Sequence, residues 1–434
     1  MELITNKKIF KFWLPLAATW LMMSLEGPFL AAIIARLIDP KYNLAAYGVA
    51  FSFALIIEAP VIMMMSAATA LVKDYGSFKK LRNFNFIISG LITGIMLILL
   101  IPSIFDFIAY NLIGLEKQVE ELTYKAFFVL LPWPGAIGYR RFYQGIMIRN
   151  NLTRRVAYGT VIRLTTMSLT SLSLYHFTEL PGAVVGASSL SIAVLSEAIA
   201  SRFMAHKIVT QIKIENVDSE EIGYRNIFNF YYPLALTSLI GLGVHPMVTF
   251  FIGQSRMALE SLAVFPVINS LVFIFRSLGL SYQEVVIALV GDKGEHINQL
   301  ISFAIKLGLF LAIGLIIIAV TPISYLWFNS VSGLSNELSN FSKLPTIIIS
   351  IMPALTVLIS IQRAILVSFK NTSPITYATI IEVSIIILTL FVSIKMFDFT
   401  GIVASVIGFI LGRICAVTYL MFPFNKIKMK LLKN

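Results

Sequence analysis

One stretch of the sequence occurs twice: FWLPLAAT at residues 12–19 and FYYPLALT at residues 230–237. The copies are 218 positions apart, and the same register pairs Pro28 with Pro246. A second block agrees at an offset of 219, with the matches Pro134 and Pro353, Tyr158 and Tyr377, Thr160 and Thr379, and Ile162 and Ile381. Two blocks in the same order, near half of the 434-residue length, predict a chain built from two similar halves.

The chain is strongly apolar, with 58% hydrophobic and 13% charged residues, a composition typical of membrane proteins. A helix needs roughly 20 apolar residues to cross about 30 Å of hydrocarbon. Such stretches recur about twelve times, roughly at 12–36, 44–72, 84–112, 124–148, 156–178, 181–205, 227–253, 261–290, 300–328, 345–369, 375–395 and 401–423. We therefore expect an all-α polytopic membrane protein with two six-helix halves around a central cleft. Because each half has an even number of spans, both halves enter the bilayer from the same side and are parallel repeats.

A long polar stretch in mid-chain runs from His206 to Arg225. It predicts a cytoplasmic linker at 206–225 between an N-terminal lobe at 1–205, with helices one to six, and a C-terminal lobe at 226–434, with helices seven to twelve and a basic tail. Lysine and arginine residues outside the spans are concentrated on the side of both termini. By the positive-inside rule, both termini are expected in the cytoplasm, and the protein is expected to be a multi-pass protein of the plasma (inner) membrane. The rule also explains the net charge of +12 without a nucleic-acid partner.

The sequence lacks the signatures of common enzymes and metal sites. It contains no HExxH, GxSxG or GxxxxGK motif, and its four histidines are far apart. The single cysteine, Cys415, excludes an internal disulfide and a cysteine-based metal cluster. We expect no enzymatic activity, no metal and no cofactor, apart from H⁺ or Na⁺ as a coupling ion. We expect a monomer whose partners are membrane lipids and a small-molecule substrate. A non-transporting scaffold or receptor is disfavoured, because the sequence holds no sizeable soluble domain.

Ionisable residues inside the predicted spans cost about 2.5–3.5 kcal/mol each on insertion scales, so they usually face a wet cavity or a partner. Here eight cations outnumber five acids. Arginine binds carboxylate and phosphate through two parallel hydrogen bonds, so the surplus favours an anionic substrate. The candidate substrate-binding residues are Arg140, Arg141, Arg163, Arg276 and Arg363. Structural pairing of these arginines with the acids is an equally good explanation. Three further cations near span ends are expected to reach the cytoplasmic headgroups: Arg202, Lys306 and Arg413.

Acidic residues and one histidine are candidates for ion coupling or gating: Glu26, Glu58, His245, Glu284 and Glu382. Glu26 and His245 lie beside prolines at matching places in spans one and seven, where exposed carbonyls can help to bind a proton or a sodium ion. A single buried histidine is, however, more often a hydrogen-bonded structural group. In the register of the repeat, the position that matches Glu58 lies within a few residues of Arg276, and Arg163 and Glu382 occupy equivalent positions. These pairs predict either a gate between the lobes or fixed ion pairs between helices.

Prolines inside the spans predict helix bends, because proline removes a backbone donor and clashes with the preceding turn. The predicted bends are at Pro28, Pro60, Pro134, Pro246 and Pro353. Such bends are compatible with the rocking of two halves against each other.

Two polar turns carry a likeness to a known family. They span residues 145–154 and 364–374, between the fourth and fifth spans of each half. Together with twelve spans in two parallel halves and a proline in the first span of each, they resemble the multidrug and toxic compound extrusion (MATE) transporters of the MOP flippase superfamily. The resemblance covers nearly the whole chain and implies an alternating-access transporter of the rocker-switch kind.

A narrower likeness is to the progressive ankylosis (ANK) family of the same superfamily, carried by residues 44–52 and 230–236. That family is associated with export of anions such as citrate, pyrophosphate or nucleotides, which agrees with the arginine surplus. Multidrug members commonly place acids in the cavity of one or both lobes; here Glu26 matches, whereas His245 replaces the second carboxylate. The leading hypothesis is export of a small organic or phosphorylated anion. The alternatives are H⁺- or Na⁺-coupled efflux of organic cations and flipping of a lipid-linked precursor.

Overall fold

The computed structural model describes residues 4–34, 36–112, 115, 117–215, 222–291, 293–332 and 334–433, so that 216–221 of the predicted linker lie outside the described residues. Within these ranges every regular element is helical, with twenty α-helices, two π-helical turns and no strand. Nine helical segments of this described chain are long and apolar enough to cross a bilayer. The all-α polytopic membrane fold predicted from the sequence is confirmed.

The helices form two compact units. Unit 1 contains Met1–Ser24 and Ile240–Asn434, and unit 2 contains Leu25–Leu239. This division differs from the lobes expected at 1–205 and 226–434, because it falls inside the first and seventh spans. The first half of each of these spans packs with helices of the other sequence half.

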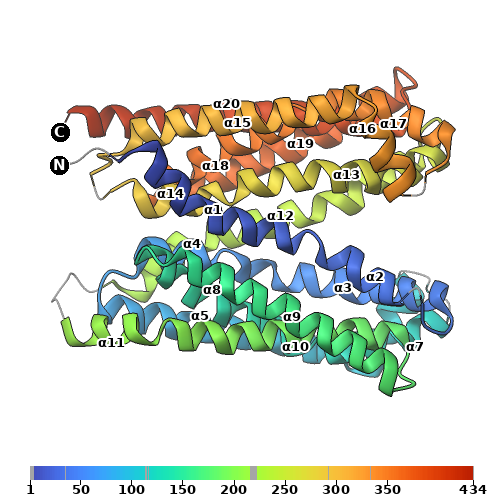
Figure 1. The fold of residues 1–434 in the computed structure, drawn as a ribbon, viewed down its shortest axis with the longest axis horizontal. Coiled ribbons are helices and arrows are strands. Elements are labelled where there is room, and N and C mark those ends of the chain that lie inside the picture. The colour runs from blue at the N-terminus through green and yellow to red at the C-terminus, as the bar shows by residue number, and fades with distance from the viewer. Residues whose placement is uncertain are drawn as a thin grey trace. The chain divides into compact units, whose positions relative to one another are not determined.

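Unit 2 is a bundle in which α10 packs against α9, α8, α7 and α3, and α8 packs against α4 and α5 (Figure 1). Its helices are α2 (Glu26–Ile34), α3 (Pro40–Ile62), α4 (Met64–Leu71), α5 (Tyr75–Leu99), α6 (Pro102–Asp106), η1 (Phe107–Leu112), α7 (Lys117–Val129), α8 (Trp133–Arg149), α9 (Thr153–Phe177), α10 (Gly182–Met204), α11 (His206–Glu215) and the first half of α12 (Tyr224–Gly253). Buried alanines pack around Phe127 and Met96 in its apolar core. Small residues of this kind let helices approach closely in a membrane.

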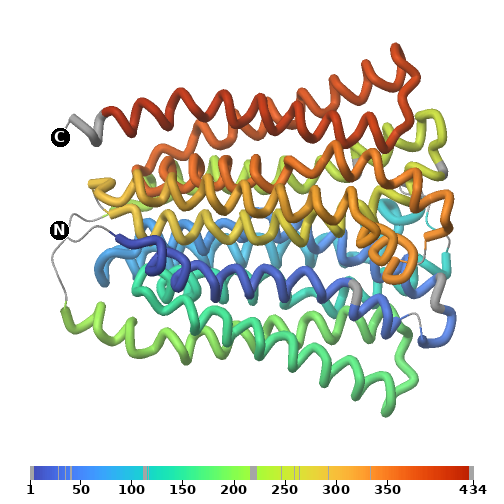
Figure 2. Tube along the Cα trace, turned by 45° about the horizontal axis from the view of Figure 1, so that its top comes forward, coloured from blue at the N-terminus to red at the C-terminus, as the bar shows by residue number. Residues whose placement is uncertain are grey.

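Unit 1 is a bundle in which α20 packs against α19, α18 and α17, and α18 packs against α13, α14 and α15. Its helices are α1 (Asn6–Met23), the second half of α12, α13 (Ala258–Leu280), α14 (Tyr282–Leu289), α15 (Ile297–Val320), α16 (Ile323–Tyr325), η2 (Leu326–Val331), α17 (Asn336–Ile349), α18 (Met352–Ser368), α19 (Ser373–Lys395) and α20 (Gly401–Lys433). Figure 2 shows that α1 begins and α20 ends at the same end of this unit.

The repeated motif supplies the aromatic side chains that hold the first halves of α1 and α12. Trp13 donates from its indole Nε1 to Oγ of Ser281, at 2.8 Å, and to the carbonyl of Leu278, at 3.2 Å. Tyr231, at the matching position of the second copy, donates from its hydroxyl to the carbonyl of Pro60 at 2.5 Å. Leu278 and Pro60 are themselves 218 positions apart, so the two contacts are repeats of each other. Each buried aromatic donor is therefore satisfied by a carbonyl of the other sequence half.

The backbone repeats with nearly the same offset. The turns η1 and η2 begin 219 positions apart, and so do α8 and α18. After these two helices, Asn151 and Lys370 adopt left-handed conformations, with φ of 61° and 57°. The next residue in each half donates its N–H to the carbonyl five positions back, at 2.9 Å and 2.8 Å, which is the Schellman arrangement of a helix end. The polar turns predicted from the sequence thus have one geometry in both halves.

Most of the prolines predicted to bend helices lie at or next to helix interruptions. Pro28 follows the break between α1 and α2, and Pro60 precedes the break between α3 and α4. Pro134 and Pro353 occupy the first turns of α8 and α18, where a missing N–H leaves no intrahelical bond unmade. By contrast, α12 continues through Pro246 without an interruption. The side chains of Pro28 and Pro246 lie outside the described part of the structure.

Candidate functional site

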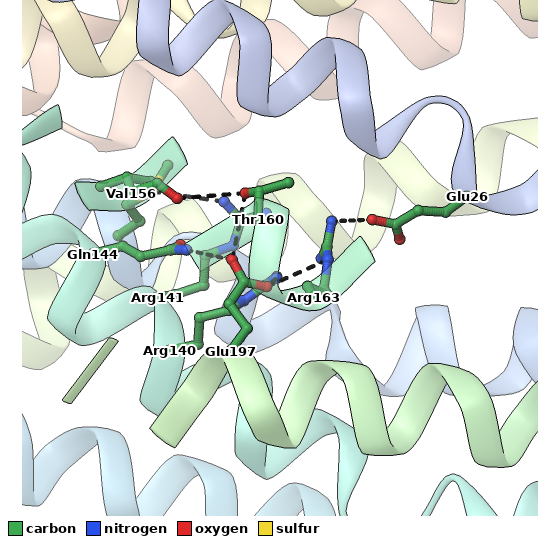
Figure 3. Close-up of polar contacts among 9 residues, drawn as sticks. Glu26, Arg140, Arg141, Gln144, Val156, Thr160, Arg163 and Glu197 are labelled. Carbon is green, nitrogen blue, oxygen red and sulfur yellow. Dashed lines mark hydrogen bonds and ion pairs between the residues drawn. The ribbon is translucent and has the colours of Figure 1, made fainter. Parts of the chain in front are cut away.

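Buried polar residues of unit 2 converge on Glu197 of α10 (Figure 3). Its side chain is fully buried, and both carboxylate oxygens accept bonds. Oε2 pairs with the guanidinium of Arg140 on α8 and with Nε of Arg163 on α9, the latter at 3.3 Å. Oε1 accepts from Nε2 of Gln144 at 2.9 Å and from Oγ1 of Thr160 at 3.5 Å. A carboxylate is tolerated in an apolar interior only with such donors, so Glu197 ties α8, α9 and α10 together.

Glu26 joins this network from the start of α2. Its Oε1 accepts a hydrogen bond from the guanidinium of Arg163, which Figure 3 shows between Glu26 and Glu197. The first turn of a helix also favours a negative charge, because the unpaired N–H groups point toward it. Arg163 is therefore paired inside unit 2 with two carboxylates, instead of with Glu382 as one interpretation of the repeat predicted.

Arg141 and Glu58 are buried beside this network. Arg141 is 8% exposed and donates to the thioether sulfur of Met65 at 3.7 Å. Glu58 is 5% exposed, and within the described chain its Oε2 has no hydrogen-bond partner. The charges of Arg140, Arg141 and Arg163 act on it. The unit 2 cluster, defined as Glu26, Glu58, Arg140, Arg141, Arg163 and Glu197, thus holds three positive and three negative formal charges, which cancel.

A second cluster lies in unit 1 around Glu382 of α19. Its Oε1 accepts from two guanidinium nitrogens of Arg413 on α20, at 2.7 Å and 2.8 Å. Arg363 on α18 donates to Oγ1 of Thr379 at 3.1 Å, and the charges of Arg363 and Arg276 also act on Glu382. The sequence predicted that Arg413 reaches the headgroups; the structure pairs it with Glu382 instead, because a buried carboxylate lies within reach.

Two arginines of unit 1 have no carboxylate partner among the described residues. The Nε atoms of Arg276 and Arg363 are buried without a hydrogen-bond partner. His245 of α12 contacts the rings of both Phe265 and Phe409, at centroid distances of 6.2 Å and 6.3 Å, and the charge of Arg276 acts on it. The unit 1 cluster, defined as His245, Arg276, Arg363, Glu382 and Arg413, therefore holds three arginines and one glutamate. The remaining candidate, Glu284, is buried near the start of α14.

The repeat places opposite charges at matching positions. Glu58 and Arg276 are 218 positions apart, and Arg163 and Glu382 are 219 positions apart. As a result, the central ion pair joins an arginine on α9 to a glutamate on α10 in unit 2, but a glutamate on α19 to an arginine on α20 in unit 1. The site predicted from the sequence does not include Glu197, although Glu197 is one of the five acids inside the predicted spans and that position is the signal that points to it.

A separate cavity of about 560 Å³ opens in unit 2 near the ends of α2, α3, α7 and α9. Charged side chains of both signs line it, including Arg36, Asp39, Lys125 and Glu179, and its lining includes none of the predicted site residues. In the ranges that the structure describes, no group of three histidine, cysteine, aspartate or glutamate residues is placed to hold a metal ion. The two charge clusters are therefore the strongest candidates for a functional site.

Comparison with solved structures identifies the fold. The chain matches an outward-facing multidrug resistance MATE family transporter of the MOP superfamily over 98% of its own length and 95% of that chain, with a TM-score of 0.75 and 15% identity. This is the MATE fold. It is shared with a MOP superfamily transporter from Pyrococcus furiosus (TM-score 0.73, 15% identity, 97% and 96% of the two chains). It is also shared with a variant of the Vibrio cholerae MATE transporter VcmN (TM-score 0.73, 16% identity, 97% and 96% of the two chains).

The likeness is confined to structure. No protein-family model matches the chain, and no curated protein matches its sequence. At 15–16% identity, the likeness shows the helical framework of this chain and does not extend to the chemistry of the two clusters.

Proposed function

We propose that this chain is an alternating-access transporter that exports a small organic or phosphorylated anion across the plasma membrane. The observation that carries the proposal is the unit 1 cluster, in which three arginines surround one glutamate. A guanidinium in apolar surroundings is costly without a partner, and a bound anion removes that cost. The unit 2 cluster has equal numbers of arginines and glutamates, so it needs no bound anion to balance its charge.

Citrate, pyrophosphate and nucleotides are the proposed substrates, in line with the likeness to the ANK family in residues 44–52 and 230–236. The Pyrococcus furiosus transporter of the same fold is described as having a binding pocket of reverse polarity that suggests a different function. A MATE fold with an inverted charge pattern therefore has a precedent. We further propose a monomer with cytoplasmic termini and no cofactor, in which Glu26, Glu58, His245, Glu284 or Glu382 binds H⁺ or Na⁺.

Transport in proteoliposomes tests the proposal. The purified full-length protein is reconstituted into liposomes loaded with radiolabelled citrate, pyrophosphate or ATP, and release is measured with and without H⁺ or Na⁺ gradients. We expect release of at least one anion above protein-free liposomes, reduced about tenfold by Arg276→Gln, since hydrogen bonds to charged groups contribute about 1.5–3 kcal/mol. The control is Lys306→Gln, which removes an exposed positive charge of α15 outside the cluster. Release of no anion, with normal reconstitution, would refute the proposal.

Efflux of organic cations, coupled to H⁺ or Na⁺, is the second candidate. Two observations favour it: the matching MATE structure is a multidrug resistance transporter, and the unit 2 cluster holds three buried or half-buried glutamates. Cells that express the protein would then export ethidium, and Glu26→Gln would abolish that export. Ethidium export without any anion transport would replace the leading proposal with this one.

A further inference from the structure

We infer that unit 1 contains a binding site for an organic anion that bears an aromatic ring. The anionic group binds Arg276 and Arg363, and the ring packs against Phe265 and Phe409. This inference rests on the proposed anion transport and deepens it, because it names the residues of the site and narrows the class of substrate.

The balance of charge selects unit 1 over unit 2. In unit 2 each arginine lies near a glutamate, and the formal charges of the cluster cancel. In unit 1 the single glutamate of the cluster, Glu382, is held by two nitrogens of Arg413. Two positive charges therefore remain in excess, and an anion of one or two charges would balance them.

The hydrogen bonds of the two remaining arginines, Arg276 and Arg363, indicate where the anion binds. Within the described chain Arg276 makes no hydrogen bond or ion pair, and its Nε atom is buried. Arg363 has one neutral acceptor, Thr379 Oγ1, and a buried Nε without a partner. The charges of Arg413 and Arg363 also repel Arg276. Both residues are half-buried, so the described chain does not enclose either of them completely. An acceptor that accepts from both would satisfy the buried donors and screen the repulsion.

Aromatic side chains beside these arginines define the rest of the ligand. Phe265 of α13 and Phe409 of α20 lie parallel, with ring centroids 6.3 Å apart and an interplanar angle of 7°. His245 is exposed, contacts both rings and is the group on which the charge of Arg276 acts. Phe409 also lies one helical turn before Arg413, so the rings and the charges belong to one region of unit 1. A bare phosphate or citrate leaves these rings unused, whereas an aromatic anion packs on them.

Matched ligand pairs test the need for a ring. Binding to the purified full-length protein in detergent is measured by isothermal titration calorimetry with AMP and ribose 5-phosphate, which carry the same phosphate with and without an aromatic base. Benzoate and acetate form the same comparison for a carboxylate. We expect each aromatic ligand to bind about tenfold or more tightly than its partner, because stacking on an aromatic side chain contributes about 1–3 kcal/mol per base. Equal affinities within both pairs, or no saturable binding of AMP and benzoate, would overturn the inference.

Variants locate the site. Arg276→Gln and Arg363→Gln are expected to weaken AMP binding about tenfold or more. Phe409→Leu is expected to weaken AMP but leave ribose 5-phosphate unchanged, which also shows that the variant is folded. Lys306→Gln in the same unit serves as the control and is expected to bind like the unaltered protein. If AMP binds but the two arginine variants bind it normally, the site lies elsewhere and the inference is wrong.

The binding assay tests the assigned site, and the transport assay tests the proposed function, so the two can be refuted independently. If the liposomes release anions but the arginine variants bind AMP normally, the assigned site is wrong while the proposed function stands. If AMP binds through Arg276 and Arg363 but no anion crosses the membrane, the site stands and the proposed transport is refuted.

Discussion

Neutralising Glu197 should destabilise unit 2 more than any other single charge removal in that unit. In Glu197→Gln, the amide nitrogen that replaces one carboxylate oxygen is a donor and cannot accept from another donor. Of the two oxygens, Oε2 serves Arg140 and Arg163, whereas Oε1 serves Gln144 and Thr160. A nitrogen at the Oε2 position removes the acceptor of Arg140, and a nitrogen at the Oε1 position removes the acceptor of the Gln144 amide, so either orientation leaves a buried donor unpaired.

The magnitude follows from the removed partner. Breaking a buried ion pair by removing one member costs about 3–5 kcal/mol, because the other charge is left buried and uncompensated. Unfolding entropy is about 2.1 cal/mol/K per residue, or roughly 0.45 kcal/mol/K for the 215 positions of Leu25–Leu239. The thermal midpoint of unit 2 should therefore fall by roughly 7–11 °C.

Thermal unfolding in detergent, followed by tryptophan fluorescence, measures the change. Glu121→Gln, at an exposed position of α7, is the matched control and should shift the midpoint by less than about 2 °C, as expected for an exposed charge. The double variant Glu197→Gln with Arg140→Gln should be more stable than the sum of the single changes by about 1–3 kcal/mol, since it removes both charges of one pair. Unchanged stability of Glu197→Gln, or simple additivity in the double variant, would refute the assigned network.

Three further predictions concern packing and pairing. Trp13→Phe removes the indole donor that holds α1, so we expect a loss of about 1–2 kcal/mol in the free energy of unfolding and faster proteolysis of the N-terminal segment, measured by limited trypsin digestion. Gly145→Ala places a methyl group 2.6 Å from Cβ of Ala68, and we expect a loss of about 1–3 kcal/mol in thermal unfolding, because α4 and α8 must separate. Arg413→Lys keeps the charge but loses the second nitrogen on Glu382, so it should lower stability by about 1 kcal/mol, less than Arg413→Gln does in the same assay.

The framework of helices could be predicted from the sequence because it depends on local composition. Apolar stretches of about 20 residues specify spans directly. The repeat around Pro15 and Pro233 predicted two equivalent halves, and the structure shows the same offset in η1, η2 and the left-handed residues Asn151 and Lys370. Each of these features depends on a short stretch of the chain, so it can be predicted from a pattern in the sequence.

Partner choice within the clusters could not be predicted in the same way. Arg163 is separated from Glu26 by 137 positions, and Arg140 is separated from Glu197 by 57. Which acid each arginine reaches depends on how α2, α8, α9 and α10 pack. The sequence alone does not distinguish between several acids that lie at similar depth in the membrane. The same ambiguity explains why Arg413 was expected near the headgroups rather than beside Glu382.

The exchange of half-helices between the two sequence halves has a consequence for biosynthesis. Tyr231 reaches its acceptor, Pro60, after 171 further residues have been made, so unit 2 can close soon after the first half of α12 leaves the ribosome. Trp13 must wait for Ser281, 268 positions later, and α1 therefore stays undocked in the membrane while unit 2 assembles. A gene cut within residues 206–225 would yield two fragments that each lack a half-helix of the unit they mainly form. Such fragments should be stable only when they are made together in the same cell.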